Sequence, residues 1–133
     1  PFGGIGRGMK VGKEEMCGLL AAVERYLKVD HDAEYRDMES EVAEIRKALD
    51  GVSGIRTDRH VPVIANEVPH VTVEWDEAGR GKTSTQVAEE LKAGDPPIHV
   101  QRPKPGQLLI SVWMMRGDEH AIVGRRLREI LSV

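Results

Sequence analysis

The sequence has little of what marks several large protein classes. It contains one cysteine, which excludes an internal disulfide framework. Its 19 basic and 22 acidic residues give a net charge of −3, so it lacks the basic surface typical of nucleic-acid-binding proteins. It has no apolar run long enough to span a membrane and no charged and then apolar leader. We therefore expect a cytoplasmic protein that binds neither nucleic acid nor membranes.

Common catalytic motifs are also missing. Two glycine-lysine strings imitate the end of a P-loop, but Arg7 and Asp76 stand where its first glycine is required. No serine lies in a Gly-x-Ser-x-Gly turn. Cys17 falls within a predicted helix and is interpreted as a small packed residue. No metal site is predicted, because no histidine is part of a His-x-x-x-His pair or lies at ligand spacing from the cysteine: His60, His70, His99, His120.

The apolar periodicity predicts two helices first. Residues 13–28 place large apolar side chains at helical spacing, which predicts one buried face: Met16, Leu19, Leu20, Val23, Leu27. A second helix, capped by Asp30 or Asp32, continues the same periodicity and ends at Asp50-Gly51: Tyr35, Met38, Val42, Ile45, Leu49. We expect the two helices to pack on each other or on one sheet.

The rest of the chain mixes strands and helices. Residues 61–64, 71–75, 98–102 and 108–114 are predicted strands, and the last of them is apolar enough to be central. Thr83 and Gln86 form a capping box after a polar loop over 76–82, and a closing helix covers 118–131. The predicted order is α-α-β-β-α-β-β-α. This order is typical of an α+β protein with a small, mostly antiparallel sheet covered by helices.

A glycine-rich turn before the first helix is the main candidate site. The string Gly6-Arg7-Gly8-Met9-Lys10-Val11-Gly12 places two cations next to a helix N-terminus. Unpaired backbone N–H groups and the helix dipole favour an anion there, and Arg7 and Lys10 would hold it by charge. The alternative is a solvated bend in which the glycines serve only to turn the chain.

The same turn carries a family resemblance. Arg-x-x-Lys-x-x-Lys, followed by a helix ending Ala-x-Val-Glu-Arg-Tyr-Leu, resembles the C-terminal region of the L-seryl-tRNA(Sec) selenium transferase-like and D-glucosaminate-6-phosphate ammonia lyase-like group of fold-type I pyridoxal-phosphate enzymes. The strings Gly94-Asp95-Pro96-Pro97-Ile98-His99-Val100 and Gly106-Gln107-Leu108-Leu109-Ile110 are similar to later segments of that group. The resemblance spans nearly the whole chain.

This resemblance implies a C-terminal piece of a pyridoxal-phosphate-dependent lyase or transferase. Residues 1–12 would be the turn at the junction with a large domain, and residues 13–133 the small α+β domain. The lysine that binds the cofactor lies upstream in such enzymes, and the absence of an initiator Met before Pro1 agrees with a fragment. Lys10 lacks the surroundings of that lysine. The fragment alone is therefore expected to be inactive.

The resemblance also implies a site and partners. Positions matching Arg7 and Lys10 would bind an anionic group of an amino-acid-like substrate, and the small domain would help to form and close the substrate cleft. Lys10 stands where the selenium transferases proper have arginine, which favours the lyase-like relatives. A homo-oligomer formed through the missing large domain is expected. The alternative function is a stand-alone, non-catalytic α+β interaction module.

Overall fold

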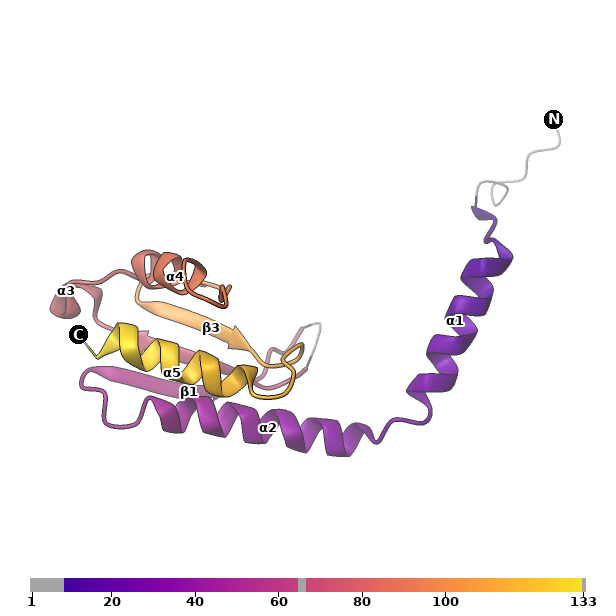
Figure 1. The fold of residues 1–133 in the computed structure, drawn as a ribbon, viewed down its shortest axis with the longest axis horizontal. Coiled ribbons are helices and arrows are strands. Elements are labelled where there is room, and N and C mark those ends of the chain that lie inside the picture. The colour runs from indigo at the N-terminus through magenta and orange to yellow at the C-terminus, as the bar shows by residue number, and fades with distance from the viewer. Residues whose placement is uncertain (1–8, 65–66, 133) are drawn as a thin grey trace. The chain divides into compact units, whose positions relative to one another are not determined.

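The chain divides into two compact units, residues 1–31 and residues 32–133. The computed structural model describes residues 9–64 and 67–132 (Figure 1). Helix α1 is the helix of the first unit, and the other elements follow along the second. Their bounds are α1 (Lys13–Tyr26), α2 (His31–Ala48), β1 (Ile55–His60), β2 (His70–Trp75), α3 (Glu77–Arg80), α4 (Ser84–Lys92), β3 (Gln107–Ser111) and α5 (Glu119–Leu131).

The three strands form one antiparallel sheet in the order β1-β2-β3. On the central strand β2, Val73 pairs with Thr57 of β1 and with Leu108 of β3. Side chains alternate between the two faces of a strand, so Val71, Val73 and Trp75 share one face and all three are buried. The sheet therefore has one apolar face and one polar face.

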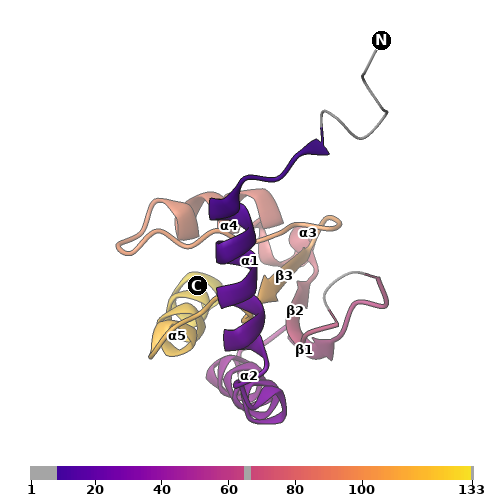
Figure 2. The same ribbon diagram turned by 90° about the vertical axis from the view of Figure 1, so that its right-hand side faces the viewer.

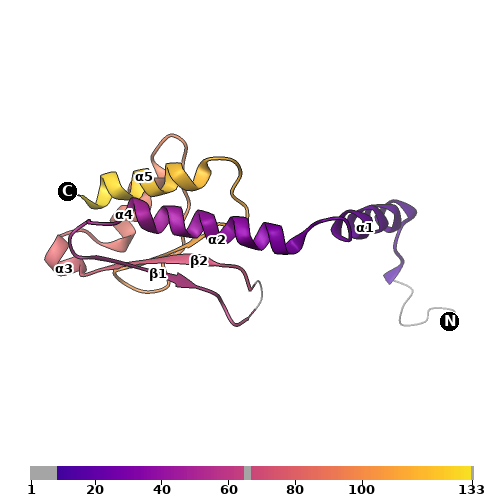
Figure 3. The same ribbon diagram turned by 90° about the horizontal axis from the view of Figure 1, so that it is seen from below.

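Helices cover the apolar face. Figures 2 and 3 both show α2 and α5 on the same side of the sheet, and α4 contributes Val87 and Leu91 to the same core. Gly124 of α5 lets the two long helices approach closely, because a Cβ there would lie 2.8 Å from the Cβ of Ala48. The core residues are Val42, Ile45, Leu49, Val71, Val73, Trp75, Val87, Leu91, Leu108, Ile110, Val112, Val123, Leu127, Ile130 and Leu131.

The predicted fold class is confirmed. The structure is α+β with a small antiparallel sheet, and α2, β2, α4 and α5 lie where periodicity placed them. The capping box is also present. The Thr83 hydroxyl accepts from the Gln86 amide at 3.2 Å, and the Gln86 side chain accepts from the Thr83 amide at 2.8 Å. Gly51 ends α2 with a φ of 76°, a value that glycine adopts without strain.

The predicted strand over 61–64 is wrong. The strand before β2 is β1, which ends at His60, while Val63 and Ile64 are exposed. Pro62 cannot donate to a ladder, and β1 has the polar sequence IRTDRH, without the apolar alternation that marks a strand. Its pairing with β2, and not its composition, makes this segment a strand.

The second half differs in three further places. Residues 98–102 form only an isolated bridge between Gln101 and Leu109, since four prolines around them, at 96, 97, 103 and 105, remove ladder donors. The last strand ends at Ser111 and lies at an edge of the sheet, with alternating burial, so it is not central. The loop over 76–82 contains α3. The order is therefore α-α-β-β-α-α-β-α.

The buried face predicted for the first helix is not covered by the described residues of the first unit, 9–31. Helix α1 forms as predicted, but none of its residues is buried. Met16, Leu19, Leu20 and Val23 are 53%, 66%, 60% and 45% exposed, and Leu27, just beyond the helix, is exposed as well. The apolar pattern correctly predicted a helix, while its burial needs a surface that the first unit does not provide.

Candidate functional site

The predicted cationic turn is only partly described. Arg7 lies outside the described residues, and Lys10 is exposed, two positions before the N-cap Gly12 of α1. Gly12 has an extended backbone with φ −69° and ψ 163° and offers no side-chain cap. The first amides of α1 are thus left for another acceptor.

Acidic side chains of α1 already lie over its N-terminus. A Cβ on Gly12 would lie 2.2 Å from Oε2 of Glu15 and 3.1 Å from Oε2 of Glu14, so both carboxylates fold back toward the helix start. This position is favourable, because the helix dipole is positive there. An incoming anion would have to displace these carboxylates. Lys10 is exposed beside this helix start, whose N-terminus is already covered by its own carboxylates.

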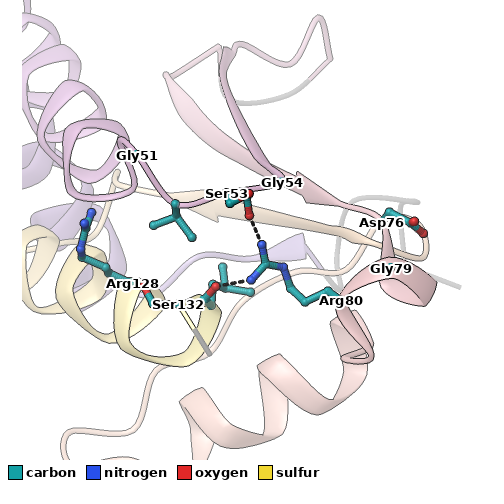
Figure 4. A pocket seen from close by; sticks show the side chains of 10 residues that line it. Gly51, Ser53, Gly54, Asp76, Gly79, Arg80, Arg128 and Ser132 are labelled. Atoms are coloured by element: carbon teal, nitrogen blue, oxygen red, sulfur yellow. Dashed lines mark hydrogen bonds between the residues drawn. The ribbon is translucent and has the colours of Figure 1, made fainter.

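The second unit has a hollow of about 610 Å³ between the α2–β1 turn, α3 and the end of α5 (Figure 4). Two arginines line it, but both are engaged by the backbone. Arg80 donates to the carbonyls of Ser53 and Leu131. Arg128 donates to the carbonyl of Ala48 at 2.8 Å and to that of Asp50 at 2.9 Å.

These arginines stabilise helix ends. The last carbonyls of a helix accept no hydrogen bond from within the helix and carry a partial negative charge. Cations near them are therefore stabilising. Arg80 does this for α5 and Arg128 for α2, and Lys82 adds a bond to the carbonyl of Ile130 at 3.3 Å. This hollow is therefore a structural junction whose cations serve the fold. No local pattern predicts it, since Arg80 lies in a segment predicted as loop.

A second hollow, of about 430 Å³, lies at the N-terminus of α4 between Thr85, Arg102 and Lys104. Donors beside this hollow that could bind an anion already bind the Glu77 carboxylate. Glu77 accepts from the amide of Ser84 at 2.5 Å, from the hydroxyl of Ser84 at 2.8 Å and from the amide of Gly106 at 2.8 Å. The backbone bonds from Ser84, then Gly106, lower the pKa of Glu77. This hollow already contains its own carboxylate.

A charged cluster lies on the polar face of the sheet. Glu74 accepts from Arg56, from Lys104 at 3.0 Å and from Gln107 at 2.5 Å. The hydrogen bonds from Arg56 and then Lys104 lower the pKa of Glu74 to about 2. This cluster joins all three strands and the 103–106 turn, and both of its cations are paired with the Glu74 carboxylate.

Other reactive side chains do not converge within residues 9–64 and 67–132. No group of three His, Cys, Asp or Glu residues there is placed to hold a metal ion. The Nε2–H of His120 donates to the Glu44 carboxylate at 2.9 Å, which joins α5 to α2. Cys17 is exposed on α1. In the same part of the chain no helix combines the length and apolar character needed to cross a membrane.

The described residues do not fit pyridoxal phosphate by themselves. The cofactor needs a lysine for covalent attachment beside donors for its phosphate. The hollow lined by Arg80 and Arg128 contains no lysine and its arginines bind carbonyls, while in the hollow beside α4 Lys104 is paired with Glu74.

The fold recurs in part of a solved enzyme structure, in agreement with the sequence resemblance to the ammonia lyase-like enzymes. The solved structure that carries it is D-glucosaminate-6-phosphate ammonia-lyase. The match has a TM-score of 0.69 and 24% identity, and covers 96% of this chain and 34% of that one.

Two curated relatives agree with this structural match. One, from a Streptomyces species, is 5'-C-glycyluridine monooxygenase-decarboxylase, 31% identical over 98% of this chain and 33% of its own length. The other is D-glucosaminate-6-phosphate ammonia lyase of Salmonella typhimurium, 26% identical over 96% of this chain and 34% of its own length. No family model matches. The chain spans about a third of the length of the relatives it matches.

Proposed function

We propose that this chain is the C-terminal part of a longer pyridoxal-phosphate-dependent lyase or transferase. Its substrate would be an amino acid or amino sugar acid with an anionic group, and this part would help to form and close the substrate cleft. The observation that carries the proposal is the match of nearly the whole chain to one third of D-glucosaminate-6-phosphate ammonia-lyase. That relative acts, by its name, on an amino sugar acid bearing a phosphate.

In this proposal the chemistry is divided between two parts of the polypeptide. The cofactor and its lysine belong to the two thirds that have no counterpart in residues 1–133, because the described residues do not fit the cofactor. This part supplies Arg7 and Lys10, whose charges bind the substrate anion. Lys10 acts as a point charge, while Arg7 can form two parallel hydrogen bonds with a carboxylate or phosphate.

Cofactor attachment tests the division. We expect the longer protein to absorb as a lysine adduct of pyridoxal phosphate, and borohydride to fix the cofactor on a lysine outside residues 1–133. The position is read from the mass of the tryptic peptides. A cofactor fixed stoichiometrically on Lys10 would overturn the division, and a longer protein that binds no cofactor would favour a non-catalytic interaction module.

Substrate-anion binding is tested by kinetics of the longer enzyme. Arg7→Ala is expected to lower kcat/KM by roughly ten- to a hundredfold, since a charge-assisted hydrogen bond is worth about 1.5–3 kcal/mol. Lys10→Arg is expected to have a smaller effect, because the charge remains. Lys92→Ala is the control, since Lys92 is exposed at the end of α4. Equal rates for Arg7→Ala and Lys92→Ala would mean that the turn is a solvated bend that does not bind the substrate anion.

A second reaction is a candidate because the Streptomyces relative is 31% identical over nearly the whole chain. Its name describes oxygen insertion with decarboxylation of an amino-acid-bearing nucleoside. The two reactions release different products. The longer enzyme is therefore assayed with both relatives' substrates, and ammonia release, oxygen uptake and carbon dioxide release are measured together. Ammonia without oxygen uptake supports the lyase, and oxygen uptake coupled to carbon dioxide supports the oxygenase.

A further inference from the structure

The middle of α1 is apolar on more than one side. Residues 16–23 read MCGLLAAV and include no charged or strongly polar side chain over two helical turns. At 100° per residue, Met16, Leu20 and Val23 lie along one side. The side chains on the opposite half of the helix are small ones: Cys17, Gly18, Ala21, Ala22.

This composition does not suit a helix that stays in water. The apolar side of a helix is normally buried against another element, and a helix of 14 residues is marginal in water on its own. Yet α1 has no buried residue, and a Cβ added at Gly18 would meet nothing within 4 Å. The sequence of α1 therefore requires more contacts than the described residues 9–31 supply.

We propose that α1 is enclosed by the rest of a longer polypeptide, in contact with residues outside 1–133. The large side chains Leu19, Leu20 and Val23 pack into a groove of that part, and the small side lets another of its elements approach closely. This inference rests on the proposed function in one respect, that the chain is part of a longer protein. It goes beyond it by assigning α1, and not only the cationic turn before it, to the interface.

The length of the relatives favours this occupant over a second copy. The relatives match this chain over 96% or more, α1 included, and two thirds of their length has no counterpart here. A second copy that paired through the same large side chains would form an isologous contact and cover that side alone. The small side would remain in water, whereas a larger body can cover both.

Photochemical cross-linking in the longer protein tests the occupant. Benzoylphenylalanine replaces Leu19 in one variant and Lys92 of α4 in a control, and the adducts are located by mass spectrometry. A mixture of ¹⁵N-labelled and unlabelled protein separates links within one polypeptide from links between two. We expect Leu19 adducts on residues outside 1–133 of the same polypeptide and no such adducts from Lys92. Adducts within residues 1–133, or mixed-isotope adducts, would overturn the inference.

Thiol labelling gives a second readout that needs no bulky substitution. In the native longer protein, N-ethylmaleimide is expected to modify Cys17 at least about tenfold more slowly than in urea, because a buried helix exposes its side chains only through local opening. Equal rates would show that α1 stays in water and would overturn the inference. Neither readout depends on the cofactor. If the longer protein binds no cofactor but shows the expected cross-links, the proposed function is wrong and this inference stands. If it binds the cofactor but shows no such cross-links, the proposed function stands and this inference is wrong.

Discussion

Helices α1 and α5 carry apolar side chains at similar spacing and have opposite environments. In α5, Val123, Leu127 and Ile130 are buried against α2 and the sheet. In α1 the large apolar side chains from Met16 to Val23 are 45% to 66% exposed, and no residue is buried. Apolar periodicity therefore specifies that a helix forms and which side is apolar, but the covering surface is supplied elsewhere. Substitutions with the same chemistry in the two units should accordingly have different effects.

The largest difference is expected from placing a carboxylate in each unit. Ile110→Asp puts an unpaired charge opposite Val71 in the core, which costs several kcal/mol against a total stability of about 5–15 kcal/mol. We expect the second unit to lose its cooperative thermal transition. The transition is measured by near-ultraviolet circular dichroism, to which Trp75 contributes. Leu20→Asp in α1 is the matched control. A cooperative Ile110→Asp protein would show that the core is elsewhere.

Glycine-to-alanine exchange is expected to have opposite signs in the two units. Gly106 has a φ of 67°, and a Cβ there would lie 2.4 Å from the carbonyl oxygen of Trp75. Gly106→Ala should therefore destabilise the second unit by at least about 1–3 kcal/mol. A Cβ added at Gly18 would meet nothing within 4 Å, so Gly18→Ala should raise the helicity of α1. The expected stabilisation of the helix is up to about 1 kcal/mol. Chemical denaturation gives the first value, and far-ultraviolet circular dichroism gives the second. Equal effects would contradict the comparison.

The caps of the two units also differ. Thr83→Ala removes the acceptor of the capping box on α4 and should cost about 0.5–2 kcal/mol, measured by urea denaturation. Ser40→Ala, on the exposed side of α2, removes the same hydroxyl where no cap depends on it and should change stability little. Helix α1 has no side-chain cap to lose. A Thr83→Ala protein as stable as the Ser40→Ala protein would mean that the box adds nothing.

The smallest effect is expected from acid. Glu74 and Glu77 have pKa values below the ordinary range in the folded second unit, so both bind protons more weakly there than in the unfolded chain. The stability they add is present above about pH 4.5 and is lost as the pH falls toward about 2 for Glu74. Melting temperatures of the wild type and Glu74→Gln should differ at pH 7 and converge near pH 2. Ser40→Ala, which changes no ionisable group, should follow the wild type at both pH values.

Local rules predicted the helices well, because caps and periodicity act within a few residues. Thr83 and Gln86 are three positions apart, and Gly51 ends α2 by its own backbone preference. The strands were harder. Strand β1 has almost no apolar residues and depends on β2, whose paired residues lie 10 to 20 positions later along the chain. The apolar segment after β3 is loop.

The candidate site divides in the same way. Lys10 and the glycines around it are visible in the sequence, and so is the resemblance to the ammonia lyase-like enzymes that the comparisons confirm. The engagement of Arg80 and Arg128 by carbonyls could not be predicted, because each of these bonds joins residues 27 to 80 positions apart. Without those bonds, the two arginines would have been candidates for substrate binding.

Neighbouring residues and readable strings were enough to predict where most helices begin and end, the α+β class and the family resemblance. Which strand is central, which cations serve helix ends and which apolar faces are buried became visible only in the folded chain. Those properties arise from contacts between distant residues, whose free energy no local pattern contains. Helix α1 is the clearest case, because its apolar pattern is complete in the sequence while its partner is not among the described residues 9–31.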